Sequence, residues 1–258
     1  PVKDMLAYQA IKKHLEEILG ASQLYKSGLT IHTTLDFRLQ QAAQDAVANG
    51  LLALEARIQA NGIQSEGPQA ALVSLDVNSG AILAMEGGKD FDESSYNRAT
   101  TARRQPGSAF KPIVYAYAVE HGFAQNKMIL DSPIVFKGIG QDDEWSPQNF
   151  SKNFLGEISL RKALAISQNI PAVRLMEMLG PNSVARFAHS LGIEAKLDPN
   201  LSLALGTSEV TLLDITSAYS VFPRQGKWIE PFGVTEVTDH HGRILWRAKT
   251  QKKLVMSR

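Results

Sequence analysis

Strand-like segments enclose a long helical stretch in this chain of 258 residues, and this order restricts the folds open to it. Residues 28–36 alternate β-branched and polar side chains, as a half-buried strand does. Two short strands are predicted on either side of a turn at 78–80, and a strand–turn–strand pattern returns at 232–248. The segments that follow Ser108 have mainly helical spacing. Strands, then helices, then strands predict an α+β domain in which a helical cluster lies beside a mixed sheet.

Start and stop signals place the individual helices. A helix over residues 4–19 should end at Gly20, and Asp36 should cap the next one, over 37–58. A polar break at 60–68 then predicts a domain boundary. Further helices are expected over residues 159–167, 171–180, 182–192 and 211–222, with N-terminal caps at Ser159 and at the pair Thr211 and Asp214.

Composition excludes several classes of function. The formal net charge of +1 gives no electrostatic basis for binding nucleic acid or an acidic membrane surface. Cysteine is absent, and no group of His, Asp or Glu has metal-ligand spacing, so we expect no disulfide, no metal and no cofactor. No apolar run approaches the roughly 18 residues of a membrane span. The chain opens without Met, which indicates a piece of a longer protein.

The stretch RRQPGSAFKPIVYAYAVEHG places Ser108 where a basic loop meets an apolar helix, and Lys111 follows three residues later. A serine hydroxyl is a weak nucleophile unless a base takes its proton, and a base at i+3 lies on the same helix face. Burial lowers the pKa of a lysine and supplies such a base. The pair therefore predicts an acyl-transfer nucleophile; the alternative is a capping serine followed by a solvated lysine.

A second motif, Ser167-Gln168-Asn169, lies between two predicted helices. Its hydroxyl can relay a proton and its amide can hydrogen-bond a substrate amide, although three such residues also suit a loop that ends a helix. Ser-x-x-Lys followed by Ser-x-Asn is the order found in penicillin-binding proteins and class A β-lactamases. A Ser-His-Asp hydrolase is disfavoured because no Gly-x-Ser-x-Gly elbow surrounds Ser108, and His240-His241 falls in a predicted surface turn.

Five separated segments extend this likeness: TIHTTLD, NRAT, RRQPGSAFKP, WSPQNF and ALAISQNIPAVRL. In this order they resemble the transpeptidase region of class A, bifunctional penicillin-binding proteins, from about Gly28 to the end of the chain. The resemblance implies the penicillin-binding-protein/β-lactamase-like α+β fold. It also implies that residues 1–67 are the linker after a glycosyltransferase domain and that residues 68–258 are the transpeptidase domain.

The resemblance implies a reaction and a set of roles. The family cross-links peptidoglycan: its serine attacks the D-Ala-D-Ala bond of a stem peptide, an amine of a second stem peptide takes the acyl group, and β-lactams trap the serine. Carried over, Ser108 is the nucleophile, Lys111 its base and Ser167 the proton relay. Asn169 binds the substrate backbone, and we expect Trp145 and Asn149 of WSPQNF to contact substrate as well.

The resemblance also places the protein in the bacterial cell envelope, on the periplasmic face of the inner membrane, held by an N-terminal anchor expected outside this chain. Alternatives of the same fold are a D,D-carboxypeptidase, a β-lactamase and a non-catalytic β-lactam-binding sensor or scaffold.

One part of the family pattern is missing. Lys249-Thr250 is followed by Gln251 rather than Gly, and it comes too early for the family's Lys-Thr-Gly motif. We therefore expect the C-terminal strands of the sheet to be missing, the isolated chain to acylate poorly, and a complementary C-terminal segment to carry Lys-Thr-Gly.

Overall fold

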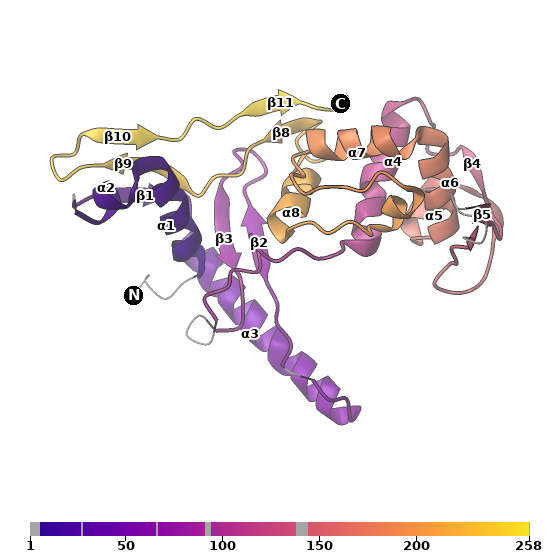
Figure 1. Ribbon diagram of the computed structural model, residues 1–258, viewed down its shortest axis with the longest axis horizontal. Helices are drawn as coiled ribbons and strands as arrows, with labels where there is room; N and C mark the ends of the chain where they lie inside the picture. The colour runs from indigo at the N-terminus through magenta and orange to yellow at the C-terminus, as the bar shows by residue number, and fades with distance from the viewer. Residues whose placement is uncertain (1–5, 27, 66, 91–93, 138–143, 258) are drawn as a thin grey trace. The chain divides into compact units, whose positions relative to one another are not determined.

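The computed structural model describes residues 6–26, 28–65, 67–90, 94–137 and 144–257 (Figure 1). The chain forms two compact units. Unit 1 holds the described residues of 1–103 and 211–256, and unit 2 holds the described residues of 104–210 with Ser257. This division follows packing, because strands from the two ends of the sequence pair within unit 1. It differs from the boundary predicted after residue 67, which separates a linker from a transpeptidase domain by resemblance and stays a prediction.

Unit 1 is built on short antiparallel strands. In its described part, β1 (Thr30–Thr33) pairs with β9 (Val234–Thr238), which also pairs with β10 (Ile244–Arg247). The two other pairs are β2 (Leu72–Leu75) with β3 (Ile82–Glu86), and β8 (Lys227–Ile229) with β11 (Lys252–Leu254). The hairpin of β2 and β3 and that of β9 and β10 confirm the two predicted turns.

The helices of unit 1 are α1 (Leu6–Leu19), α2 (Ala21–Lys26), α3 (Phe37–Ala60) and α8 (Leu212–Ser220). Of these, α3 and α8 begin where the sequence predicts, α2 was not predicted, and the predicted start of α1 at residue 4 lies outside the described residues. Asp36 caps α3 by accepting hydrogen bonds from the backbone N–H groups of Arg38 and Leu39, at 2.8 and 3.1 Å. The Thr211 and Asp214 capping box on α8 is also confirmed.

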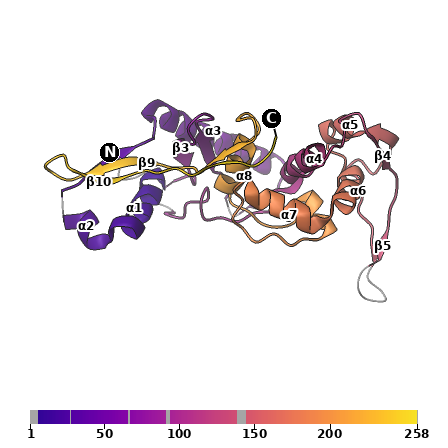
Figure 2. The same cartoon turned by 90° about the horizontal axis from the view of Figure 1, so that it is seen from above.

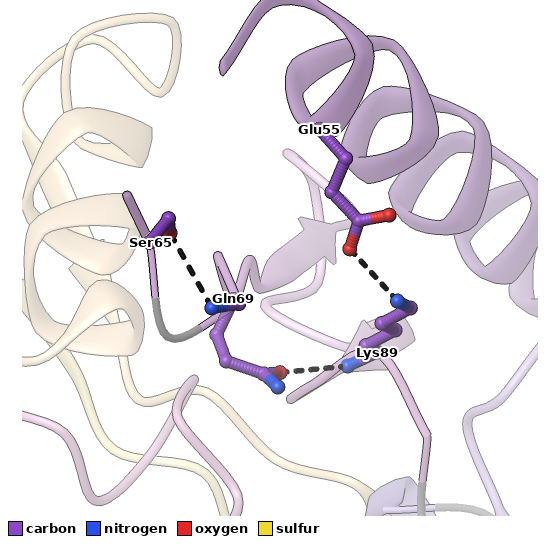
Figure 3. Close-up of polar contacts among 5 residues, drawn as sticks. Glu55, Ser65, Gln69 and Lys89 are labelled. Carbon is purple, nitrogen blue, oxygen red and sulfur yellow. Dashed lines mark hydrogen bonds and ion pairs between the residues drawn. The ribbon is translucent and has the colours of Figure 1, made fainter. Parts of the chain in front are cut away.

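Polar contacts attach α3 to the β2–β3 hairpin. The buried side-chain amide of Gln40 imitates a neighbouring strand, because Nε2 donates to Met85 O and Oε1 accepts from Met85 N, at 3.0 and 2.9 Å. Farther along α3, Glu55 forms an ion pair with Lys89 Nζ at 2.8 Å (Figure 3). The backbone N–H of Lys89 donates to Gln69 Oε1 at 3.0 Å (Figure 3). The chain between α3 and β2 is thus held against the residues that follow β3.

Unit 2 is mainly helical. Its 3₁₀ helices are η2 (Gly107–Phe110) and η3 (Leu201–Leu205), and its α-helices are α4 (Lys111–Glu120), α5 (Leu160–Ala165), α6 (Asn169–Leu179) and α7 (Pro181–Ser190). Of these α-helices, α6 packs against β4, and α4 and α7 lie on the other side of α6 (Figure 1 and Figure 2). Their core is made of fully buried apolar side chains, among them Phe110, Ile113, Ile170, Leu175, Leu191 and Leu203.

Short strands in unit 2 were not predicted. β4 (Met128–Asp131) pairs with β7 (Gly156–Ser159), and β5 (Phe136–Lys137) pairs with β6 (Glu144–Trp145). Each spans four residues or fewer, too short for a period-two pattern to be recognised. The described chain contains both helices and antiparallel strands, which confirms the predicted α+β fold class.

Candidate active site

Ser108 lies in η2, directly before α4. Its carbonyl oxygen accepts a hydrogen bond from the backbone N–H of Lys111, which joins the 3₁₀ turn to the helix. The serine is exposed, whereas Lys111 is only 1% exposed. An exposed hydroxyl thus stands one turn before a lysine buried in the same unit, as the Ser-x-x-Lys spacing predicts.

The Lys111 side chain ends in a cage of acceptors. Its Nζ donates to Ser167 O at 2.6 Å, to Asn169 Oδ1 at 2.7 Å and to Ser167 Oγ at 3.1 Å. These three acceptors match the three hydrogens of an ammonium group. The structure therefore brings together three of the predicted site residues, although 56 positions separate Lys111 from Ser167.

Burial lowers the pKa of Lys111 from 10.5 to about 8. The cause is desolvation, which disfavours the charged amine. At pH 7 a group with this pKa is neutral in about 9% of molecules, compared with about 0.03% at a pKa of 10.5. The site therefore raises the population of the proton-accepting amine about 300-fold.

Ser167 has an unusual backbone conformation, with φ at +57°. A non-glycine residue in this left-handed region costs on the order of 1 kcal/mol. Ser167 lies between the end of α5 and the start of α6. In this conformation both its carbonyl oxygen and its hydroxyl accept hydrogen bonds from Lys111 Nζ. Such strain at a site of convergent polar groups is typical of functional residues.

Asn169 is the first residue of α6 and contacts two segments. Its Oδ1 accepts from Lys111, and its Nδ2 donates to the backbone oxygen of Gln148 at 2.8 Å. One Nδ2 hydrogen remains after the Gln148 contact is made, since an amide carries two. This hydrogen is a donor of the kind needed to hold a substrate carbonyl.

Asn149 is buried within a network of hydrogen bonds, and its predicted substrate contact stays a prediction. It is 2% exposed, and its Oδ1 accepts from the backbone N–H groups of Asn169 and Ile170, at 3.0 and 3.1 Å. Its Nδ2 donates to Asp131 Oδ1 and to Asn153 O, at 2.7 and 2.9 Å. Because these four hydrogen bonds fill the capacity of the amide, the geometry favours a positioning role over direct substrate contact.

Trp145 packs within the β5–β6 ribbon. Its ring stacks on Phe136 with the centroids 5.6 Å apart, and the residue is partly exposed. This contact accounts for the placement of the indole without a ligand, so the substrate role of Trp145 stays a prediction.

A close approach of two glycines shapes the serine turn. Gly206, which ends η3, has φ at +67°, and its carbonyl oxygen accepts from Gly107 N at 3.3 Å. A Cβ added at Gly206 would overlap the Gly107 backbone. Gly206 and Asp131 were not predicted as site residues, because their link to the site depends on contacts distant in sequence. Gln168 was part of the predicted motif, but its contact with Asp131 Oδ2 at 2.9 Å was not predicted.

The remaining sequence candidates lie in unit 1. Lys249 and Thr250 fall between β10 and β11, outside any strand, and His240-His241 is exposed in the turn after β9, as predicted. Among the residues that the structure describes, no group of three His, Cys, Asp or Glu side chains could hold a metal ion. The same part of the chain contains no helix that is both long and apolar enough to cross a membrane.

Cavity volume does not single out Ser108, because a cavity of about 360 Å³ in unit 1 is lined by Tyr96 and Asn97 among others. A second, mostly apolar cavity of about 240 Å³ in the same unit has Ile11 and Met85 among its lining residues. Neither cavity is lined by Ser108 or Lys111, which belong to unit 2. The chemistry at Ser108 and Lys111 therefore identifies the candidate active site better than volume does.

Comparison with known proteins gives an independent result. The family model described as "Penicillin binding protein transpeptidase domain" matches residues 70–258. Penicillin-binding protein 1A of Pseudomonas aeruginosa is 40% identical over 187 residues, which cover 72% of this chain and 23% of that protein. Penicillin-binding protein 2D of Bacillus subtilis is 32% identical over 252 residues, which cover 96% of this chain and 35% of that protein. The chain thus spans only a minor part of the length of these relatives.

Solved structures give a matching fold. Penicillin-binding protein 1A from Haemophilus influenzae superposes with a TM-score of 0.86 at 25% identity, over 96% of this chain and 50% of that one. PonA1 from Mycobacterium tuberculosis, in complex with penicillin V, gives a TM-score of 0.82 at 27% identity, over 98% of this chain and 66% of that one. The similarity of fold therefore extends over nearly all of the chain, and the match to the family model covers residues 70–258.

Proposed function

Since this chain belongs to the family of penicillin-binding protein transpeptidase domains, we propose that it is the serine acyl-transfer domain of a peptidoglycan D,D-transpeptidase that β-lactams inhibit. Ser108 is the nucleophile, Lys111 its base, Ser167 the proton relay and Asn169 a donor to the substrate backbone. The observation that carries the proposal is the position of Lys111 one turn after an exposed serine. Its amine is buried and donates hydrogen bonds to three acceptors.

Acylation proceeds in two proton transfers. Neutral Lys111 takes the proton of Ser108 Oγ as this oxygen attacks the carbonyl carbon between the two D-Ala residues. The C–N bond then breaks, and the departing amine of the terminal D-Ala receives a proton from Lys111 by way of the Ser167 hydroxyl. Lys111 returns to its neutral form, and an ester joins the stem peptide to Ser108.

Transfer to the second stem peptide reverses these steps. An amine of that peptide attacks the ester carbon and loses a proton along the Ser167 and Lys111 path, and Ser108 Oγ leaves with a proton restored to it. The same ester forms with a β-lactam, except that the cleaved amide stays tethered in the opened ring. Penicillin V in the PonA1 complex supports β-lactams as ligands of this site.

Substrates and location follow from the family. We propose peptidoglycan stem peptides as acyl donor and acceptor, and the periplasmic side of the bacterial inner membrane as the place of action. Trp145 is retained as a proposed substrate contact.

Covalent labelling tests the proposal. The intact protein that carries this chain is treated with a fluorescent penicillin, and the modified peptide is identified by mass spectrometry. We expect the adduct on Ser108, no labelling of Ser108→Ala, and full labelling of Ser151→Ala, which removes an exposed serine of the same unit. An adduct on another serine refutes the assignment. Labelling without transfer to an amine acceptor would indicate a β-lactam sensor, and release of free acid would indicate a carboxypeptidase or β-lactamase.

A further inference from the structure

A buried carboxylate lies behind the Ser167–Asn169 motif. Asp131, the last residue of β4, is 0% exposed. Its Oδ1 accepts from Asn149 Nδ2 at 2.7 Å, and its Oδ2 accepts from Gln168 Nε2 and Leu155 N, at 2.9 and 3.0 Å. No ion pair with Asp131 is found within the described ranges. Three hydrogen-bond donors thus stabilise this buried carboxylate in place of a positively charged partner. Burying a charge without such a partner is energetically costly.

The carboxylate decides which way the Asn149 amide points. A carboxylate has acceptors and no donor, so the end of Asn149 that faces it must be the NH₂ group. The amide oxygen is then turned toward Asn169 N and Ile170 N. Reversing the amide would place its NH₂ group against these two backbone donors. The carboxylate of Asp131 and the N–H groups of α6 therefore require the same orientation of Asn149.

This orientation caps the helix that carries Asn169. Gln168, at the N-cap position of α6, makes no capping hydrogen bond with its own side chain. Asn149, 20 residues before Asn169, accepts the first two free N–H groups of α6 instead, and the third residue is Pro171, which has none. The start of α6 is thereby fixed from a different segment of the chain.

The second oxygen of Asp131 holds the residue between the two site residues. Gln168 is 7% exposed, and its amide donates to Asp131 Oδ2. Its neighbour Ser167 has a left-handed backbone, and its other neighbour Asn169 accepts from Lys111. The residues that follow the strained Ser167 are therefore tied to one carboxylate by two routes, directly through Gln168 and indirectly through Asn149.

We infer that Asp131 is a positioning residue for the acyl-transfer site: it fixes the polarity of the Asn149 amide and the Gln168 side chain, and so sets the geometry in which Ser167 and Asn169 meet Lys111. The inference rests on the proposed acylation of Ser108. It predicts that the polarity of the Asp131–Asn149 pair matters more than the presence of a buried group at either position.

A polarity swap tests this directly. Asp131→Asn keeps the shape of the side chain but faces the NH₂ of Asn149 with a second NH₂, or else disturbs the Gln168 and Leu155 contacts. In the intact protein we expect it to slow acylation by fluorescent penicillin about 10- to 100-fold, the range of a misplacement on the order of 1 Å. Asn149→Asp alone, which sets two carboxylates against each other, should be impaired similarly.

The double variant D131N/N149D restores a donor opposite an acceptor and keeps an oxygen on Asn169 N and Ile170 N. It should recover at least half of the loss on a logarithmic scale, and repulsion between the new carboxylate and Asn153 O should limit the recovery. D239N is the matched control: Asp239 is 7% exposed and also accepts hydrogen bonds from several donors, but it lies in the β9–β10 turn of unit 1. It should lower the thermal midpoint without slowing acylation.

The outcomes separate the two proposals. A wild-type protein that is not acylated at Ser108 refutes the proposed function. If the wild type is acylated and D131N reacts within twofold of its rate, the role of Asp131 is refuted. A double variant that is acylated no faster than D131N refutes it as well. If D131N does not fold, the double variant decides: folding with acylation within about tenfold of wild type supports the inference, and failure to fold or to acylate overturns it.

Discussion

The pH dependence of acylation provides a sharp test of how burial activates Lys111. The amine is 1% exposed, and its pKa is lowered by desolvation to about 8. If neutral Lys111 is the base, the acylation rate follows the neutral fraction, about 9% at pH 7, 50% at pH 8 and 91% at pH 9. The rate should therefore rise about tenfold from pH 7 to pH 9 and then level off.

A lysine at its ordinary pKa of 10.5 would behave differently, with a rate that climbs about tenfold per pH unit throughout this range. The assay is the second-order rate constant of fluorescent-penicillin labelling, measured from pH 6 to pH 10 with Lys162→Met as the control on an exposed lysine of the same unit. No plateau below about pH 9.5, or a profile that Lys111→Met leaves in place, would refute the reasoning.

The same pKa has a consequence for stability. Because the folded pKa lies below the unfolded one, the unfolded chain binds more protons between pH 8 and pH 10.5, and the free energy of unfolding rises with pH in this window. The full shift corresponds to about 3 kcal/mol. Relative to Lys111→Met, the wild type should gain stability as pH rises through the window and show a constant difference below pH 8. Denaturant unfolding of both proteins measures this, and a difference independent of pH would contradict the burial argument.

Three further substitutions test other parts of the structure. Gly206→Ala should destabilise the protein by about 2 kcal/mol or more and slow acylation, because alanine disfavours φ of +67° and its Cβ would overlap Gly107 at the serine turn; unchanged denaturant unfolding would contradict this. Thr211→Ala should cost about 1 kcal/mol by removing the cap of α8, measured by thermal unfolding, with acylation retained. Lys89→Ala should cost less than about 1 kcal/mol, because its ion pair with Glu55 is partly solvated; a larger loss in denaturant unfolding would show that this contact does more than a surface pair.

Local signals were readable in the sequence. Asp36, Ser159 and the Thr211–Asp214 pair cap helices as expected, because a cap depends on residues within one turn of it. The spacing of Ser108 and Lys111 is also local, and the structure keeps it as one turn. Helix α2 and the strands of unit 2 escaped prediction, since short elements take their stability from partners elsewhere in the chain.

The functional geometry depended on contacts between distant segments. The sequence alone supplied Ser108, Lys111, Ser167 and Asn169 as a motif set, but the burial that lowers the pKa of Lys111 and its three acceptors arise from the packing of unit 2. The capping of α6 by Asn149 arises in the same way, because the two segments meet only in the folded chain. Nothing in the sequence pointed to Asp131. Its carboxylate orients the Asn149 amide only after folding has removed both groups from water, because water no longer competes for their hydrogen bonds.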